Sequence, residues 1–188
     1  MKEDIIIFFG SPHRSGYTAK LLNYFLKFFS NVNVTIVKAY EENIRPCIGC
    51  ESCINSSICV FRDMDRINTL LKKSDRIIIA SPIYNASFPS PLKSILDRMQ
   101  VYYFSRNILR NTLIRKKKAV ILLTQGSETV DYEEVIKAQA VPAIKLMGAD
   151  VVDILTLKGT DNKNLDIDKF YIKSENKIRN IISKFNNN

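Results

Sequence analysis

The sequence predicts an α/β fold in which a parallel sheet carries helices on both faces. Short, strongly apolar runs alternate with longer segments whose apolar residues recur at helical spacing. The apolar runs show little alternation with polar residues, which is typical of parallel strands covered on both faces. The 188 residues, of which 46% are hydrophobic, are enough for one globular domain, residues 1–188, that buries about 70% of its unfolded surface.

The first half of the chain alternates strands and helices around a cysteine-rich segment. Asp4–Phe9 (DIIIFF) is too apolar to be half exposed and is expected as a buried strand. Thr18–Phe29 has apolar residues at helical spacing and is expected as the first helix. Val32–Lys38 is the second expected strand, the cysteine loop (residues 45–62) follows it, and Met64–Lys73 is the second expected helix.

The second half continues the same alternation. Arg76–Ala80 (RIIIA) is rich in β-branched residues, and a Ser-Pro turn signal follows it. Pro91–Tyr102 places its apolar residues on one helical face. The remaining expected elements are, in order, strand Ala119–Leu123, helix Tyr132–Met147, strand Asp150–Leu155 and helix Asp168–Phe185. Five strands alternating with helices predict a flavodoxin-like three-layer α/β/α fold, with a five-stranded parallel sheet of order 2-1-3-4-5.

The composition argues against several other classes of protein. No apolar run reaches the roughly 18 residues that a membrane helix needs, and the opening MKEDIIIFFG is typical of a first strand. The formal net charge is +9, but the basic residues are spread out and no nucleic-acid-binding motif accompanies them, so no nucleic acid is expected. The densest basic stretch is expected to be a solvated face or a site for an anionic partner, such as a nicotinamide dinucleotide or an acidic redox protein. It comprises Arg106, Arg110, Arg115, Lys116, Lys117 and Lys118.

All four cysteines, Cys47, Cys50, Cys53 and Cys59, lie in the cysteine loop with the spacing C-x2-C-x2-C-x5-C. Four thiolates that converge on one point can hold a [4Fe–4S] cluster or a zinc ion. The closely spaced triplet favours the cluster, since zinc sites usually present two separated C-x2-C pairs. Disulfides are disfavoured because no export signal is recognised, which also predicts a cytoplasmic location. Cysteines that are ordinary loop or core residues, with no metal, remain an alternative.

In a sheet of this order, ligands bind beyond the carboxyl ends of the strands, where the strand order reverses. The loop after the first expected strand, GSPHRSGYT, runs directly into a helix. Its hydroxyl residues, its free backbone N–H groups and Arg14 are suitable partners for a phosphate, and His13 could add a contact. Thr18 is expected at the helix N-cap or in its first turn. The loop matches neither GxGxxG nor a Walker A motif, and an ordinary strand-to-helix turn remains the alternative. His13 is expected to be a surface residue and not a catalytic base.

The loop after the third expected strand reads SPIYNASFPSPLKSILDR, from Ser81 to Arg98. Together with GSPHRSGYT, it resembles the NAD(P)H-dependent FMN reductase branch of flavodoxin-like proteins, whose members typically read GSPR-x-x-GNT and SPvYxxsxpxxlKxxiDR at these places. With PCIGCESC between them, the chain is more similar to the iron–sulfur flavoproteins of anaerobes. The resemblance spans residues 4 to about 126 and covers three ordered motifs.

The resemblance implies an FMN site made of three loops. The phosphate would contact the first loop, the ribityl chain and isoalloxazine ring would lie along the second, and the third would border the other side of the ring. The implied residues are Ser11, His13, Arg14, Ser15, Gly16, Tyr17, Thr18, Ser81, Pro82, Ile83, Tyr84, Asn85, Ala86, Ser87, Thr124, Gln125 and Gly126. Pro82, Ile83 and Tyr84 also offer a flat apolar wall, although Tyr84 could instead fill the core. Tyr17 departs from the family's usual Asn, and Arg62 precedes Asp63 where the family usually has two aspartates.

The residues and the resemblance together predict an FMN-dependent oxidoreductase that passes electrons from FMN to a [4Fe–4S] cluster on the four cysteines. No catalytic side chain is expected, because the cofactors carry the chemistry. NAD(P)H is a possible donor, and a small molecule or a redox protein is the expected partner. The alternatives are a cluster-free NAD(P)H-dependent FMN or quinone reductase and a non-enzymatic metal-binding redox sensor. The family's usual assembly implies a homodimer or homotetramer that packs through residues 87–91 and the helix after them. Lys93, Asp97 and Arg98 are expected to serve packing or a subunit contact.

Overall fold

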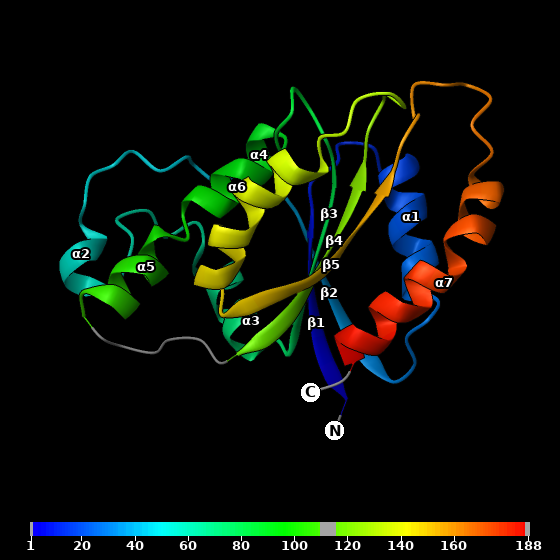
Figure 1. The fold of residues 1–188 in the computed structure, drawn as a ribbon. Coiled ribbons are helices and arrows are strands. Elements are labelled where there is room, and N and C mark those ends of the chain that lie inside the picture. Colours follow the sequence, from blue (N-terminus) through cyan, green and yellow to red (C-terminus); the bar gives the residue numbers. More distant parts are fainter. Residues whose placement is uncertain (1, 110–115, 187–188) are drawn as a thin grey trace.

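In the computed structural model, which describes residues 2–109 and 116–186, five parallel strands form one sheet of order β2-β1-β3-β4-β5. The strands are β1 (Glu3–Phe9), β2 (Val32–Lys38), β3 (Arg76–Pro82), β4 (Lys117–Thr124) and β5 (Ala149–Leu157). The helices are α1 (Tyr17–Leu26), α2 (Cys53–Ser56), α3 (Asp65–Lys73), α4 (Ser90–Asp97), α5 (Gln100–Asn107), α6 (Glu133–Leu146) and α7 (Ile167–Asn186). Figure 1 shows the sheet between two layers, with α1 and α7 on one face and α3, α4 and α6 on the other. The predicted flavodoxin-like architecture and strand order are confirmed.

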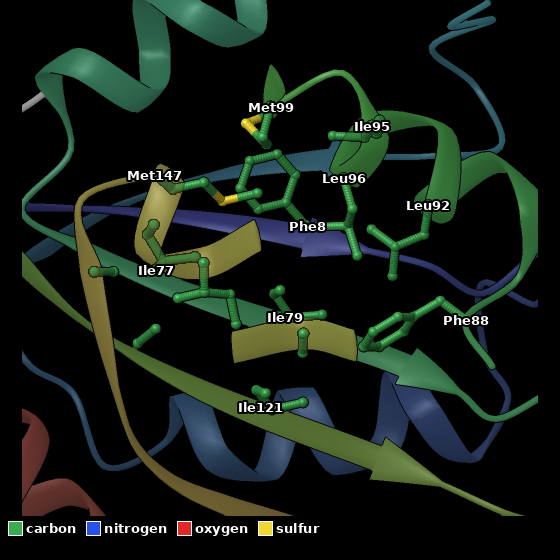
Figure 2. Packing of buried hydrophobic residues seen from close by; sticks show 14 of the residues in the cluster. Phe8, Ile77, Ile79, Phe88, Leu92, Ile95, Leu96, Met99, Ile121 and Met147 are labelled. Atoms are coloured by element: carbon green, nitrogen blue, oxygen red, sulfur yellow. The ribbon is translucent and has the colours of Figure 1, made fainter. Parts of the chain in front are cut away.

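The sheet is covered by a separate apolar core on each face. Along β1, Phe8 belongs to the core under α3, α4 and α6, while its neighbour Ile7 faces the core under α1 and α7. Figure 2 shows the Phe8 ring between Met99 and Met147, with Leu96 beside it. Burial of one such large apolar side chain stabilises the fold by about 1.5–3 kcal/mol. The strand ends are therefore fixed points from which the loops start.

The strand order reverses at β1, which pairs with β2 on one side and with β3 on the other, both in parallel. Backbone pairing continues past the strand ends there. The N–H of Gly10 donates to the carbonyl of Ala80 at 2.8 Å, and the N–H of Ile83 donates to that of Thr124 at 2.8 Å. The loops after β1, β3 and β4 consequently leave the sheet side by side.

The helix expected over Pro91–Tyr102 is in fact two helices, α4 and α5, so this prediction was wrong. At the break the backbone tightens, and the N–H of Met99 donates to the carbonyl of Leu96 at 3.1 Å, three residues back. The apolar spacing continues through the break, because Met99 and Tyr102 are both buried. The sequence pattern therefore could not reveal it. The sequence also missed α2, a single turn within the cysteine loop.

The basic stretch is not uniformly a solvated face. Lys117 is buried, and its ammonium group donates to the carbonyls of Leu71 at 2.6 Å and Ser74 at 3.0 Å. Lys118 donates to the carbonyl of Lys184 at 2.8 Å. Arg110 and Arg115 lie outside the described residues. The expectation of a solvated face is thus wrong for Lys117, because its charge is used to satisfy carbonyls at the end of α3.

No helix in residues 2–109 or 116–186 is long and apolar enough to span a membrane.

Candidate functional site at the carboxyl edge of the sheet

The loop between β1 and α1 places a buried hydroxyl and an exposed charge before a helix N-terminus. Ser11 is buried, and its hydroxyl accepts a hydrogen bond from the N–H of His13 at 3.2 Å. Arg14 is exposed and pairs with Glu41 at 2.9 Å. Gly16 is the N-cap of α1 and makes no side-chain cap. The first N–H groups of α1 are therefore not capped by the residue before them, and this favours an anion at the helix end.

Thr18 lies in the first turn of α1 and not at its N-cap. Its hydroxyl is 2.7 Å from the hydroxyl of Thr124 at the end of β4, and the pair is buried. This contact fixes the start of α1 against β4. It also means that Thr18 links two of the three expected loops to each other. His13 is exposed, as expected of a surface residue.

The loop after β3 contains a tight turn in an uncommon conformation. Tyr84 and Ser87 exchange two backbone hydrogen bonds of 2.9 Å, and both residues between them, Asn85 and Ala86, have positive φ values of 49° and 57°. Two successive left-handed residues define a type I′ turn. Asn adopts this conformation readily, but Ala does so only at a cost in free energy. Such a turn persists only where surrounding contacts hold it.

Gln139 on α6 supplies these contacts. Its amide nitrogen donates to the carbonyl of Ala86 at 3.1 Å, and its amide oxygen accepts from the hydroxyl of Ser87 at 2.9 Å. The Gln139 side chain is thus hydrogen-bonded to two consecutive residues of the turn. Sequence reasoning missed Gln139, because nothing in the pattern of α6 indicates which residue faces a loop more than fifty positions away.

A cavity of about 380 Å³ opens between the loops after β3, β4 and β5. It is lined by Pro82, Ile83, Tyr84, Asn85, Thr124, Gly126, Thr160 and Asp161. Six of these eight residues were expected site residues. Ser81 and Gln125 are buried instead, and Gln125 braces the third loop by donating to the carbonyls of Ser127 at 2.7 Å and Val130 at 2.5 Å.

Thr160 and Asp161 were not predicted, because the resemblance implied a site made only of the loops after the first, third and fourth strands. The N–H of Thr160 donates to the carbonyl of Gln125 at 3.0 Å, so the loop after β5 is tied to the loop after β4. The carboxylate of Asp161 packs against Gly126, where a side chain would collide with it. The polar turn GTDN directly after an apolar strand was the available signal.

Tyr84 is the tyrosine that lines the cavity, and its phenol influences that of Tyr40. Tyr84 is 41% exposed and lines the cavity, so it does not fill the core. Burial raises the pKa of the Tyr40 phenol above its usual value, and the nearby Tyr84 raises it further.

Helix α2, within the cysteine loop, lies beside α5 and away from the carboxyl ends of the strands (Figure 1). All four cysteines are free thiols, with Cys47 and Cys50 exposed and Cys53 and Cys59 half-buried. Burial raises the pKa of Cys53, and the neighbouring Cys59, Cys47 and Cys50 raise it further. A hydrogen bond with Ser52 lowers the pKa of the Cys50 thiol.

These four thiols suit a soft metal centre in their chemistry and lie in one neighbourhood. However, the described residues contain no group of three or more His, Cys, Asp or Glu side chains arranged to hold a metal ion. Gly49 has a positive φ of 65°, and no atom lies within 4 Å of the place that a Cβ would occupy, so the start of the loop is open on that side. The four thiols are therefore suitable ligands for a cluster, but the loop would have to bring them closer together to bind one.

Residues 4–151 match the family model described as NADPH-dependent FMN reductase. The chain belongs to this family. Its members are FMN-dependent oxidoreductases, so the expected family and the enzyme class are confirmed. An iron–sulfur flavoprotein of Archaeoglobus fulgidus is 35% identical over 96 residues, which cover 50% of this chain and 44% of that protein. An iron–sulfur flavoprotein of Clostridioides difficile is 27% identical over 191 residues, covering 96% of this chain and 77% of that protein.

Solved structures agree on the fold of this FMN reductase family member. The NAD(P)H:quinone oxidoreductase of Methanothermobacter marburgensis superposes with a TM-score of 0.70 at 19% identity, covering 96% of each chain. An FMN-dependent NADH-azoreductase of Bacillus anthracis in complex with FMN gives a TM-score of 0.64 at 14% identity, covering 98% of this chain and 100% of that chain. The chain spans about half the length of several curated relatives that it matches.

Proposed function

We propose that this FMN-dependent oxidoreductase family member binds FMN at the carboxyl edge of the sheet and passes electrons from it to a [4Fe–4S] cluster on Cys47, Cys50, Cys53 and Cys59. The observation that carries the flavin site is the cavity between the loops after β3, β4 and β5, together with the uncapped start of α1, which the contact between Thr18 and Thr124 fixes beside it. The cavity volume lies in the range of sites for small cofactors.

The phosphate is assigned to the loop of Ser11–Thr18, where the N-terminus of α1 favours an anion. Arg14 forms only an exposed ion pair with Glu41, and such pairs contribute about 0–1 kcal/mol. Its guanidinium can therefore exchange Glu41 for a phosphate at little cost.

The flavin ring is assigned to the wall of Pro82, Ile83 and Tyr84, with Thr124 and Gly126 on its other side. Ser81 and Gln125 support this wall from behind, because both are buried. The turn of Asn85 and Ala86, held by Gln139, presents backbone groups to the ring's polar edge. The site would thus be formed before the cofactor arrives, which lowers the entropy lost on binding.

FMN supplies the conversion between two-electron and one-electron transfer. The chain's residues bind and orient it, and no protein acid or nucleophile is assigned a step. NAD(P)H is the proposed electron donor, consistent with the family description and with a relative in Pelagibacter ubique named as an FMN-dependent NADH:quinone oxidoreductase. A small molecule or a redox protein is the proposed acceptor.

The cluster rests on the spacing of the four cysteines and on the names of relatives, several of which are called iron–sulfur flavoproteins. A cluster-free NAD(P)H-dependent FMN or quinone reductase is the second candidate. It is favoured by the arrangement of the thiols, which in the described chain is not yet that of a metal site.

The flavin site is tested by titrating the apo-protein with FMN. The Ser11→Ala/Arg14→Ala double variant should bind FMN about 10- to 100-fold more weakly, because two polar phosphate contacts are lost. Circular dichroism should show an unchanged fold, since Arg14 is exposed and the replacement of the buried Ser11 by alanine removes only its hydroxyl. An unchanged dissociation constant would remove this loop from the flavin site.

The two candidate functions are separated by anaerobic reconstitution with iron and sulfide. The electron-transfer function predicts about four irons and four sulfides per chain, and NAD(P)H should then reduce both chromophores. Iron well below one per chain, with the flavin still reduced by NAD(P)H, would leave the cluster-free reductase.

A homodimer or homotetramer in the cytoplasm is proposed for the native assembly, with residues 87–91 and α4 at the contact. Light scattering that shows a monomer throughout the micromolar range would reject the assembly.

A further inference from the structure

Arg98 is buried at the end of α4, and its guanidinium forms hydrogen bonds with residues on both sides of the cysteine segment. Its side chain is only 2% exposed. Nη1 donates to the carbonyl of Arg45 at 2.8 Å, and Nη2 donates to the carbonyl of Phe61 at 2.9 Å and to the Asp63 carboxylate at 2.8 Å. Arg45 lies two residues before Cys47, and Phe61 lies two residues after Cys59.

The three partners of Arg98 form the neck of the cysteine loop, which we define as Arg45, Phe61 and Asp63. The neck is also bonded within itself, since the Asp63 carboxylate accepts from the N–H of Arg45 at 3.0 Å. The Arg45 guanidinium carbon lies 3.8 Å from the centre of the Phe61 ring, which adds a cation–π contact. The backbone segments before and after the four cysteines are therefore both hydrogen-bonded to the Arg98 guanidinium.

The geometry points to Arg98 as a positioning residue: it holds the two ends of the segment that carries the four thiols close together, as the assembly of one metal centre by that segment requires. This inference rests on the proposed metal-binding function of the cysteines. Holding the ends of a flexible segment together reduces the conformational entropy that metal binding must remove. Arginine suits these three contacts because its planar fork presents several donors in fixed and divergent directions, whereas the ammonium of lysine is a compact charge on a flexible stem.

The contacts also explain why Arg98 is buried with little neutralising charge around it. Asp63 is the carboxylate that pairs with it, and the other two acceptors are main-chain carbonyls. Its Nε is buried and has no hydrogen-bond partner among the described residues. A buried cation is costly unless its donors are used, so this arginine is better explained by the loop that it fastens than by packing within α4.

Arg76 provides a matched control elsewhere in the fold. It is also a buried arginine, paired with Glu3 at 2.6 Å and donating to the carbonyls of Phe185 and Asn186. It lies at the start of β3, and its partners belong to β1 and to the end of α7. Arg76→Lys therefore tests what the loss of a buried arginine does to the fold alone.

The test is a Cd²⁺ titration of the reduced, metal-free, FMN-bound protein, followed through thiolate-to-metal charge-transfer absorption. Arg98→Lys should bind Cd²⁺ about 10- to 100-fold more weakly than the unaltered chain, the usual range for residues that orient metal ligands. Asp63→Asn should show a smaller loss in the same direction, and Arg76→Lys should show none. Equal Cd²⁺ affinity in Arg98→Lys and Arg76→Lys would overturn the inference, as would an unaltered chain that binds no Cd²⁺.

Reconstitution with iron and sulfide in parallel separates this inference from the proposed function. If the unaltered chain binds Cd²⁺ tightly in an Arg98-dependent manner but takes up no iron, the neck is confirmed and the cluster is rejected. The FMN dissociation constant should be the same in the unaltered chain, Arg98→Lys and Arg76→Lys, since none of these arginines touches the flavin loops.

Discussion

The loops at the carboxyl edge of the sheet continue the backbone pairing of the strands, whereas the cysteine loop is fastened by side chains at its neck. At the edge, Gly10, Ile83 and Gln125 each donate a backbone hydrogen bond to a neighbouring strand or its end. In the cysteine loop, Cys47 and Cys50 are exposed, and the thiols are not arranged as a metal site in the described residues. The loops at the edge are thus held in place by backbone hydrogen bonds, whereas the four thiols share one loop without having the arrangement of a metal site.

This difference agrees with what the two proposed cofactors need. A flavin ring is recognised by shape, so a preformed wall increases affinity by reducing the entropy lost on binding. A metal centre supplies strong bonds of its own, so its ligands can complete their arrangement during binding. The eight-residue helix α4, about 12 Å long, connects the two regions, with the flavin loop before it and Arg98 after it.

The largest expected effect comes from removing one thiol. Cys53→Ser should reduce the iron of the anaerobically reconstituted protein from about four per chain to below one, because four thiolates are needed to hold the cubane. The FMN dissociation constant should stay within about twofold, because Cys53 contacts no flavin loop.

Iron and sulfide analysis together with an FMN titration checks this prediction, and Asn55→Ala, at an exposed position of the same loop, serves as the control. Iron in Cys53→Ser equal to that of the unaltered chain would show that Cys53 is not a ligand.

An intermediate effect is expected at the flavin loop. Gln139→Leu removes both hydrogen bonds to the turn at Ala86 and Ser87, each worth about 1 kcal/mol. The strained turn should then spend less time in its binding conformation, which should weaken FMN binding by about 30-fold.

Iron uptake should not change in Gln139→Leu, which sharpens the contrast between the two regions. Fluorescence titration with FMN measures the effect, and Gln100→Leu, at an exposed glutamine of α5, is the matched control. If both variants bind FMN equally, Gln139 does not preorganise the turn.

The fold was predictable because each short run of β-branched and other apolar residues indicates one buried strand. The sequence DIIIFF gives β1, RIIIA gives β3, and AVILL gives β4, all buried on both faces. The strand order then placed the first, third and fourth loops at one edge, as the structure has them. The break between α4 and α5 was not predictable, because buried residues keep a helical spacing across it.

The remaining site residues depend on contacts between distant segments. Gln139 and Asp161 carry no local signal of the loops they touch, since each makes its contact through tertiary packing. Arg98 was expected to serve packing or a subunit contact, but its partners are the neck of the cysteine loop. The departure at Arg62–Asp63 kept the one carboxylate, Asp63, that this neck uses.

The smallest expected effect concerns the pH dependence of the neck. Burial alone would raise the pKa of Asp63, but hydrogen bonds from Arg98 and Arg45 outweigh it and lower the pKa below its usual value. A carboxylate with a lowered folded pKa stabilises the fold above its unfolded pKa of about 3.9, and this stabilisation is lost as the pH falls through the folded value. Asp63→Asn should therefore reduce the free energy of unfolding by about 1 kcal/mol at neutral pH. Urea denaturation of both proteins between pH 7 and pH 3 should show this difference shrinking as the solution becomes acidic. A difference that stays constant over this range would mean that the charge of Asp63 does not hold the neck, and that its contribution is one of shape alone.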